Sequence, residues 1–329
     1  METYKGFNKD MTAKNGYQYE EGKEYEEEKA VACECGFHAC EYPLDCFEYY
    51  SPANSVYHIV EQSGELSKNS SDTKVASTKI KIGAEISIAG LVKAAIEYTK
   101  EKAKPESDAT GDYGASSATG YYGASSATGD YGASSATGYY GASSATGDRG
   151  ASSATGYYGV SSATGYYGAS SATGYRGASS ATGDRGASSA TGYYGASSAT
   201  GYYGASSATG DRGASSATGD YGASSATGDY GASSATGKCS ASSATGYCGS
   251  AIAGNPESVA VAWGYKSKAK GIVGAYIVLA DWEENGRGCS GQKEWSLKSA
   301  KMVRIDGEKI KADTWYTMEN GEIVETEEE

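Results

Sequence analysis

The sequence has no long apolar run and is poor in several residue types that carry binding chemistry. Its 329 residues include 2 histidines, 4 prolines and 3 phenylalanines. No window approaches the roughly 18 consecutive apolar residues of a membrane-spanning helix. The first residues, METYKGFNKDMTAKNG, lack the basic segment and apolar run of a secretory signal. We therefore expect no membrane contact, and a protein that stays in the cytoplasm of its host cell or is carried in a virion.

Positive charge is also scarce. The chain has 28 Lys and Arg against 41 Asp and Glu, which gives a formal net charge of −13. A protein that follows nucleic-acid phosphates needs clustered cations, so we expect no direct nucleic-acid binding. One alternative use of the negative charge stays open, namely an acidic mimic that occupies the nucleic-acid groove of a partner.

The seven cysteines do not form the even, regularly spaced set of a secreted disulfide framework. Four of them surround His38 in the segment VACECGFHACEYPLDC. Structural zinc sites favour cysteine pairs separated by about two to four residues, with a longer loop between the pairs. Cys33, Cys35, His38 and Cys40 fit this spacing poorly and are weak metal-ligand candidates. We predict buried structural thiols, no metal and no other cofactor.

A nine-residue repeat fills the middle of the chain. The triplet Ala-Thr-Gly recurs with its glycine at 111, 120, 129 and every ninth residue to Gly246, without an insertion or deletion. Low-complexity disorder tolerates drift in repeat length, whereas a solenoid does not, because one extra residue breaks the stacking of neighbouring coils. The glycines disfavour helix, and glycine is absent from every third position as collagen would require. The repeat therefore predicts a β-solenoid.

The repeat also predicts the geometry of each coil. A strand of about five residues followed by a Gly-x-x-Gly turn accounts for one repeat, and two repeats make a flattened coil of two short strands. In GASSATG of 114–120, Ser116 and Ala118 share one face of the strand. The two sheets must therefore lie close together, and stability must come mainly from backbone ladders. About eight coils fit in the region of regular repeats.

The variable pair between the two glycines separates the two edges of such a solenoid. The first residue of the pair is mostly aspartate on one edge and mostly tyrosine on the other. The aspartates lack the Gly-Gly-x-Gly-x-Asp pattern of calcium-binding β-rolls. The tyrosines either clamp the turns by stacking or form an aromatic strip for sugar, base or protein contact. The candidate binding residues are Tyr121, Tyr139, Tyr157, Tyr175 and Tyr193 on the tyrosine edge and Asp112, Asp130, Asp148, Asp184 and Asp220 on the acidic edge.

The flanking segments have the composition of folded caps. ISIAGLVKAAIEYTKEKAK, from Ile86, reads as an amphipathic helix with Ile88, Leu91, Ala95 and Tyr98 near one face. After the repeat, GAYIVLADW, KSAKMVRID, ADTWYTM and GEIVE read as strands. The predicted fold class is mainly β: an α+β N-terminal capping domain at 1–106, a nonapeptide-repeat β-solenoid with two strands per coil at 107–264, and a β-rich C-terminal cap at 265–329.

Several short segments outside the repeat are distinctive: YKGF at 4–7, GYQYEEGKEY from 16, CGFHAC at 35–40, YYSP at 49–52, STKIKIGAEISIAGLVKAAIEY from 77 and RIDGEKIKADTWY from 304. They resemble segments of an uncharacterised family of bacteriophage and prophage proteins. The resemblance implies an N-terminal domain of unknown function, small-residue repeats and a β-rich ending, without an activity. The repeat itself is loosely similar to the head repeats of trimeric surface adhesins, in which Ser-x-Ala-x-Gly strings build a β-roll.

No phosphate loop, dinucleotide fingerprint, hydrolase triad or paired-carboxylate site can be recognised, so we do not expect an enzyme. The observations favour a non-catalytic, phage- or prophage-encoded β-solenoid that binds a host macromolecule or forms part of a particle. Its partner would be an unidentified host or phage protein, and homo-oligomers are compatible with this role. The alternatives are a purely structural fibre or spacer, the acidic nucleic-acid mimic, and an adhesin-like or ice-binding surface.

Overall fold

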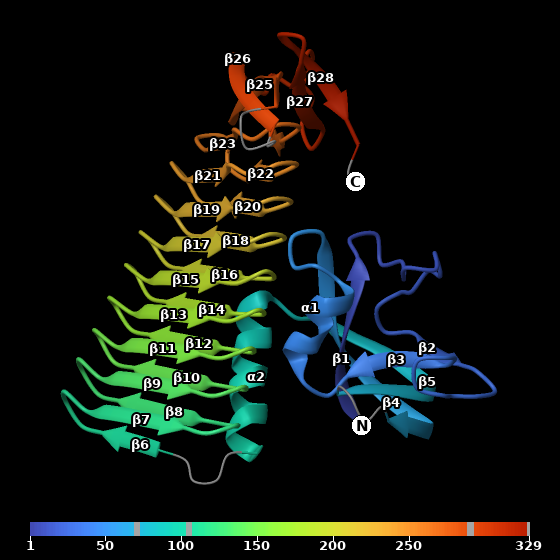
Figure 1. The fold of residues 1–329 in the computed structure, drawn as a ribbon, viewed down its shortest axis with the longest axis vertical. Helices are drawn as coiled ribbons and strands as arrows, with labels where there is room; N and C mark the ends of the chain where they lie inside the picture. The colour runs from blue at the N-terminus through green and yellow to red at the C-terminus, as the bar shows by residue number, and fades with distance from the viewer. Residues whose placement is uncertain (69–72, 103–106, 288–292, 328–329) are drawn as a thin grey trace.

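The structure, a computed structural model, describes residues 1–68, 73–102, 107–287 and 293–327. The protein is mainly β, as predicted, and consists of a small α+β N-terminal domain, a β-solenoid rod and a C-terminal strand region (Figure 1). The N-terminal domain lies beside the rod, and the C-terminal region closes one end of it. In the described part of the chain, no helix is long and apolar enough to cross a membrane.

Five strands of the N-terminal domain form one sheet in the order β2-β5-β3-β1-β4, and an additional pairing of β4 with β5 closes β5, β3, β1 and β4 into a small barrel. Phe7, Phe37 and Ile80 fill its interior. A short 3₁₀ turn, η1 (Pro43–Asp45), and one helical turn, α1 (Cys46–Tyr49), project from the barrel towards the rod. The strands are β1 (Glu2–Asn8), β2 (Glu24–Glu26), β3 (Phe37–Cys40), β4 (Ser55–Lys68) and β5 (Lys74–Glu85).

The predicted amphipathic helix is α2 (Ile88–Lys102), which buries Leu91, Val92, Ala95 and Ile96. We expected the N-terminal domain to cap the end of the rod, and this was wrong. Helix α2 instead lies along the side of the rod, against strands β8 to β16 (Figure 1). A column of small residues there gives the apolar stripe of α2 a flat surface to cover.

The rod consists of two parallel sheets whose strands alternate along the chain, and residues 18 apart pair in register. We call the sheet beneath α2 the covered sheet and the other one the open sheet. The strands of the covered sheet are β6 (Ser107–Thr110), β8 (Ala124–Thr128), β10 (Ala142–Thr146), β12 (Val160–Thr164), β14 (Ala178–Thr182), β16 (Ala196–Thr200), β18 (Ala214–Thr218), β20 (Ala232–Ala235), β22 (Ser250–Ala253) and β24 (Lys268–Gly271). Those of the open sheet are β7 (Ala115–Thr119), β9 (Ala133–Thr137), β11 (Ala151–Thr155), β13 (Ala169–Thr173), β15 (Ala187–Thr191), β17 (Ala205–Thr209), β19 (Ala223–Thr227), β21 (Ala241–Ala244), β23 (Val259–Ala262) and β25 (Tyr276–Arg287).

The two-strand coil is confirmed, and the rod is longer than the regular repeats suggest. Leaving out β27 and β28 of the 12-stranded sheet and β26 of the 11-stranded sheet, ten strands remain in each, which gives about ten turns. In the degenerate strands β22 to β24, alanine replaces the inward serine of the regular repeats, at Ala251, Ala260 and Ala269, and these small buried residues continue the ladder. The inward residues, rather than the complete repeat, determine how far the solenoid extends.

The core between the sheets is narrow and is lined by the second and fourth residues of each strand. The serine hydroxyls form a continuous chain that crosses from sheet to sheet, from Ser116 through Ser125 and Ser134 to Ser233, at 2.9–3.0 Å per step. Each hydroxyl is buried and partnered, so the polar core carries no desolvation penalty from unmade hydrogen bonds.

Two antiparallel hairpins close the C-terminal end, one on each sheet. Strand β25 pairs with β26 (Lys293–Arg304) on the open sheet. On the covered sheet, β27 (Trp315–Glu319) pairs with β24 and with β28 (Glu322–Thr326). Ile277, Leu279 and Met318 add the larger apolar side chains that the repeats lack. These are the four strands predicted after the repeat.

Candidate functional site

The five tyrosines of the predicted tyrosine edge form one stack. Ring centroids are 5.2 Å apart for Tyr121 and Tyr139, 5.1 Å for Tyr139 and Tyr157, 5.1 Å for Tyr157 and Tyr175, and 5.4 Å for Tyr175 and Tyr193. The planes are within 17° of parallel. All five rings are exposed. The rings of successive coils therefore stack on one another, and a binding role for the stack stays a prediction.

The second residues of four pairs in the middle of this edge hold the N-terminal domain, which the sequence reasoning missed. Tyr140, Tyr158 and Tyr194 are only 6–8% exposed. The ring of Tyr42 meets Tyr140 and Tyr158 edge-on, at centroid distances of 4.9 and 5.3 Å. Because these turns bury their second residue against Tyr42 and α2, we call this side of the rod the docked edge. The opposite side is the free edge.

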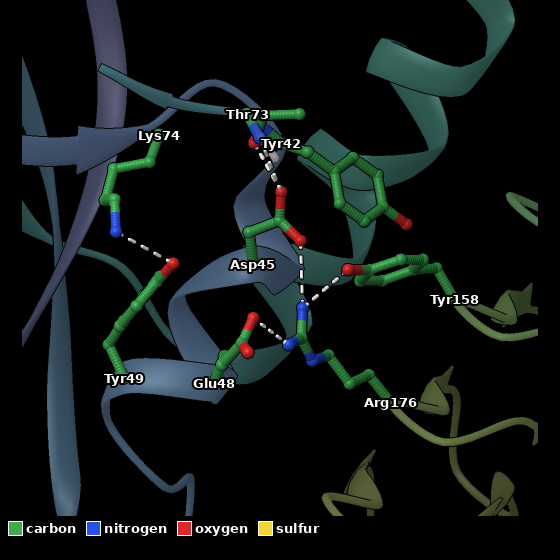
Figure 2. A network of polar contacts seen from close by, with 8 residues as sticks. All are labelled: Tyr42, Asp45, Glu48, Tyr49, Thr73, Lys74, Tyr158 and Arg176. Carbon is green, nitrogen blue, oxygen red and sulfur yellow. Dashed lines mark hydrogen bonds and ion pairs between the residues drawn. The ribbon is translucent and has the colours of Figure 1, made fainter. Parts of the chain in front are cut away.

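One arginine joins the rod to the N-terminal domain (Figure 2). Arg176 takes the place of a second tyrosine and is 2% exposed. Its Nη1 donates to Asp45 Oδ1 at 2.9 Å and to the Tyr158 hydroxyl at 2.6 Å, while Nη2 pairs with Glu48. The Thr73 hydroxyl donates to the other Asp45 oxygen. The ion pair of Arg176 with Asp45 is therefore buried at the interface, and the half-exposed Glu48 borders it.

Burial controls the protonation of this cluster. It raises the pKa of Asp45, against the hydrogen bonds from Thr73 and Tyr158 and the charge of Arg176. It also raises the pKa of Tyr140 and Tyr158 far above the usual range, with a further contribution from Asp45. The phenols therefore stay neutral and act as hydrogen-bonding and packing groups.

The aspartates of the predicted acidic edge lie in successive turns of the free edge, with Tyr166 and Tyr202 interrupting the series. Part of their role is structural. Asp130 Oδ1 accepts the N–H of Asp148 at 3.2 Å, and Asp220 Oδ1 accepts the N–H of Lys238 at 2.8 Å. These two carboxylates therefore tie consecutive coils together. A binding role for Asp112, Asp130, Asp148, Asp184 and Asp220 stays a prediction.

Beside the aspartates runs an exposed row of aromatic and cationic side chains, which we call the free-edge ladder. Tyr113 and Tyr131 stack at 4.8 Å, and Tyr203 and Tyr221 at 5.2 Å. Two guanidinium groups lie between these pairs, each within 5.0–5.6 Å of the tyrosine rings above and below. The ladder consists of Tyr113, Tyr131, Arg149, Tyr167, Arg185, Tyr203 and Tyr221.

The cysteine segment does not gather into a metal site. Cys33 is exposed at a turn with φ of 69°, so the expectation of buried thiols was wrong for it, while Cys35 is half-buried and Cys40 buried. His38 Nε2 accepts the Cys33 N–H at 3.0 Å, and burial with the charges of Lys5 and Lys74 lowers the pKa of His38. Among the described residues, no three His, Cys, Asp or Glu side chains are placed to hold a metal ion.

A cavity of about 270 Å³ lies beside this segment, at the seam where β1 and β3 share a single paired position. Tyr49, Cys46 and Lys5 are among its lining residues. Lys5 is 9% exposed, and its Nζ donates to the His38 carbonyl at 2.7 Å. Burial lowers the pKa of Lys5 to about 8. The sequence contained no signal for this buried amine.

Replacing Lys5 with methionine is expected to stabilise the protein at pH 7 by about 2 kcal/mol, because folding buries a charged amine. The folded pKa of about 8 lies below the reference value of 10.5, so the unfolded chain binds more protons between these values. The free energy of unfolding of the wild type should therefore rise relative to K5M from pH 8 to 10.5. Urea titrations across this range, with K81M at an exposed lysine as control, test this; a difference that does not change with pH would contradict it.

In the comparisons with known proteins, only the N-terminal part of the chain matches a family. Residues 1–94 match the family model described as a domain of unknown function, DUF7666. No curated protein and no solved structure matches the chain. The matched part includes the barrel, η1 and α1, hence Asp45 and Glu48, whereas their partner Arg176 lies in the rod outside it.

Proposed function

We propose that the protein is a non-catalytic, phage- or prophage-encoded β-solenoid that binds a host macromolecule through the free-edge ladder. The observation that carries this proposal is that the same kind of ladder already makes a protein contact on the docked edge. There, tyrosines and Arg176 are buried against the N-terminal domain. Tyrosine and arginine are also among the residues most enriched at the energetic centres of protein interfaces.

The turns of the two edges are built alike and are offset from each other by one repeat. Arg176 donates to the hydroxyl of Tyr158 in the preceding coil. Arg149 donates in the same way to Tyr131 at 2.7 Å, and Arg185 to Tyr167 at 3.1 Å. Arg176 has two carboxylates in addition, whereas Arg149 and Arg185 are exposed to solvent. Their remaining N–H groups suit the carboxylates of a partner.

The free edge differs from a nucleic-acid mimic because two arginines lie beside its aspartates and two tyrosines interrupt the aspartate series. A mimic would need uninterrupted negative charge at phosphate spacing. The phage or prophage origin rests on the resemblance of the segments outside the repeat, and the proposed host partner rests on that origin.

Affinity capture from a host lysate tests the binding role. The wild type is expected to retain a stoichiometric partner, and the double variant R149A/R185A to retain at least tenfold less of it. Y121S on the docked edge is the matched control and should retain within twofold of the wild type. If only Y121S lost the partner, the binding site would be the tyrosine stack rather than the free-edge ladder. The absence of any stoichiometric partner would overturn the proposal.

A structural spacer is the second candidate, favoured by the N-terminal end of the rod. In the described chain, β6 pairs only with β8 and β7 only with β9, so both are edge strands. Such edges invite pairing with another chain. Because hairpins close the other end, this route leads to end-to-end dimers rather than fibres. Light scattering at increasing concentration distinguishes the two: a dimer without a captured partner favours the spacer.

A further inference from the structure

The outer face of the open sheet carries a long shallow groove. Its volume is about 770 Å³, and it crosses seven strands, from β7 to β19. It is lined by the first and third residues of these strands, the alanines Ala115 to Ala223 and the serines beside them, and by the inner serines below. The first-position alanines are exposed in every one of these strands.

The covered sheet shows what such a surface binds. Apart from Val160 in β12, the strands beneath α2 have the same ASSAT sequence, and their first residues form the equivalent column. In this column Ala124, Ala142, Val160, Ala178 and Ala196 are at most 1% exposed, because α2 covers strands β8 to β16. Small side chains let a helix approach the sheet closely along the rod axis. The groove of the open sheet is therefore the unoccupied counterpart of the α2 seat.

The residues along one side of the groove also correspond to those that border α2 on the covered sheet. Helix α2 lies beside the docked edge, where Tyr140, Tyr158 and Tyr194 border it. A shift of one repeat places the groove beside the free-edge ladder, with Arg149 in the position of Tyr158 and Arg185 in that of Tyr194. A helix in the groove would thus meet aromatic and cationic side chains at the same place along its length.

We propose that this groove docks an amphipathic helix of a partner protein, parallel to the rod axis and with a stripe of small and aliphatic residues like that of α2. The inference rests on the proposed binding role and names its surface and partner. Seven strands span about 29 Å, which corresponds to a helix of about 19 residues. The α2 of a second copy is not the occupant, because α2 is already buried on its own rod.

The probe is a fluorescent peptide with the sequence of residues 86–102, ISIAGLVKAAIEYTKEK. An isolated helix of this length is marginal in water, so a second peptide carries a hydrocarbon staple between the exposed positions Lys93 and Glu97. Anisotropy titrations with the full-length protein should show saturable one-site binding, tighter for the stapled peptide. A169K in the groove should weaken this binding at least tenfold.

The matched control is T173K, on the same strand and the same face but outside the groove, which should bind within twofold of the wild type. Equal binding by A169K and T173K would place the peptide elsewhere and overturn the inference. So would the absence of saturable binding for both peptides. Neither result would change the outcome of the capture experiment with R149A/R185A. The proposed binding role and the proposed helix groove can therefore be refuted independently.

Discussion

Replacing Gly156 with alanine is expected to disrupt the middle of the rod, at a cost of at least about 3 kcal/mol. A Cβ at Gly156 would lie 1.6 Å from the carbonyl oxygen of Gly138 in the preceding coil, which is backbone and cannot move aside. The φ of Gly156 lies outside the left-handed region, so the cost comes from collision rather than from backbone strain. Hydrogen exchange of strands β11 to β13 should show the loss, because solenoid coils open locally.

The control is G254A, in a degenerate coil of the same rod. There the added Cβ would meet Thr236 at 3.1 Å, a contact that a small shift relieves. We expect G254A to cost less than about 1 kcal/mol in thermal unfolding. Comparable losses in the two variants would show that the glycines are needed for a reason other than the close approach of stacked turns.

The close approach of glycines in stacked turns also explains why variation in the repeat is concentrated at the two positions between the glycines. The glycine after threonine faces the glycine of the neighbouring coil, and the second and fourth strand residues fill a core too thin for larger side chains. The pair between the glycines points away from the core at the edges, so tyrosine, aspartate and arginine are all accepted. Variation at the edges costs the rod little and changes what the edges contact.

The period, the strands, the two-strand coil and the stacked tyrosines could be predicted because each depends on local pattern alone. The place of the N-terminal domain could not. It depends on contacts between residues more than a hundred positions apart, such as Asp45 with Arg176. The second tyrosines of the docked edge look no different in sequence from those of the free edge. Only their burial against the N-terminal domain, which the structure shows, distinguishes the tyrosines of the docked edge from the exposed tyrosines of the free edge.

Near-identical coils create a second problem, since the N-terminal domain could dock one coil higher or lower. Two departures from the repeat remove this ambiguity. Val160 replaces the alanine of the covered column beneath α2 and is fully buried, and Arg176 replaces the second tyrosine. A shift by one coil would put Asp45 opposite a tyrosine ring instead of a guanidinium group. The buried ion pair therefore fixes the register of docking, a role for which such pairs are well suited.

Removing the guanidinium group with R176A is expected to weaken docking of the N-terminal domain by about 3–5 kcal/mol, because Asp45 stays buried without its cation. The charge of Glu48 contributes less, since that side chain is 51% exposed. Amide exchange in α2 should accelerate strongly, while exchange in the open sheet stays slow. Hydrogen exchange followed by mass spectrometry resolves the two regions.

R185A is the matched control, because Arg185 makes the same hydrogen bond to the tyrosine of the preceding coil but contacts no N-terminal carboxylate. Its cation–π contacts with Tyr167 and Tyr203 are exposed, so their loss should cost at most about 1 kcal/mol and leave exchange in α2 unchanged. If R185A accelerated exchange in α2 as much as R176A, the effect would come from the Tyr–Arg ladder itself. If R176A left exchange in α2 unchanged, the apolar contacts of α2 and the stacked tyrosines would hold the domain alone, and the buried pair would not set its register.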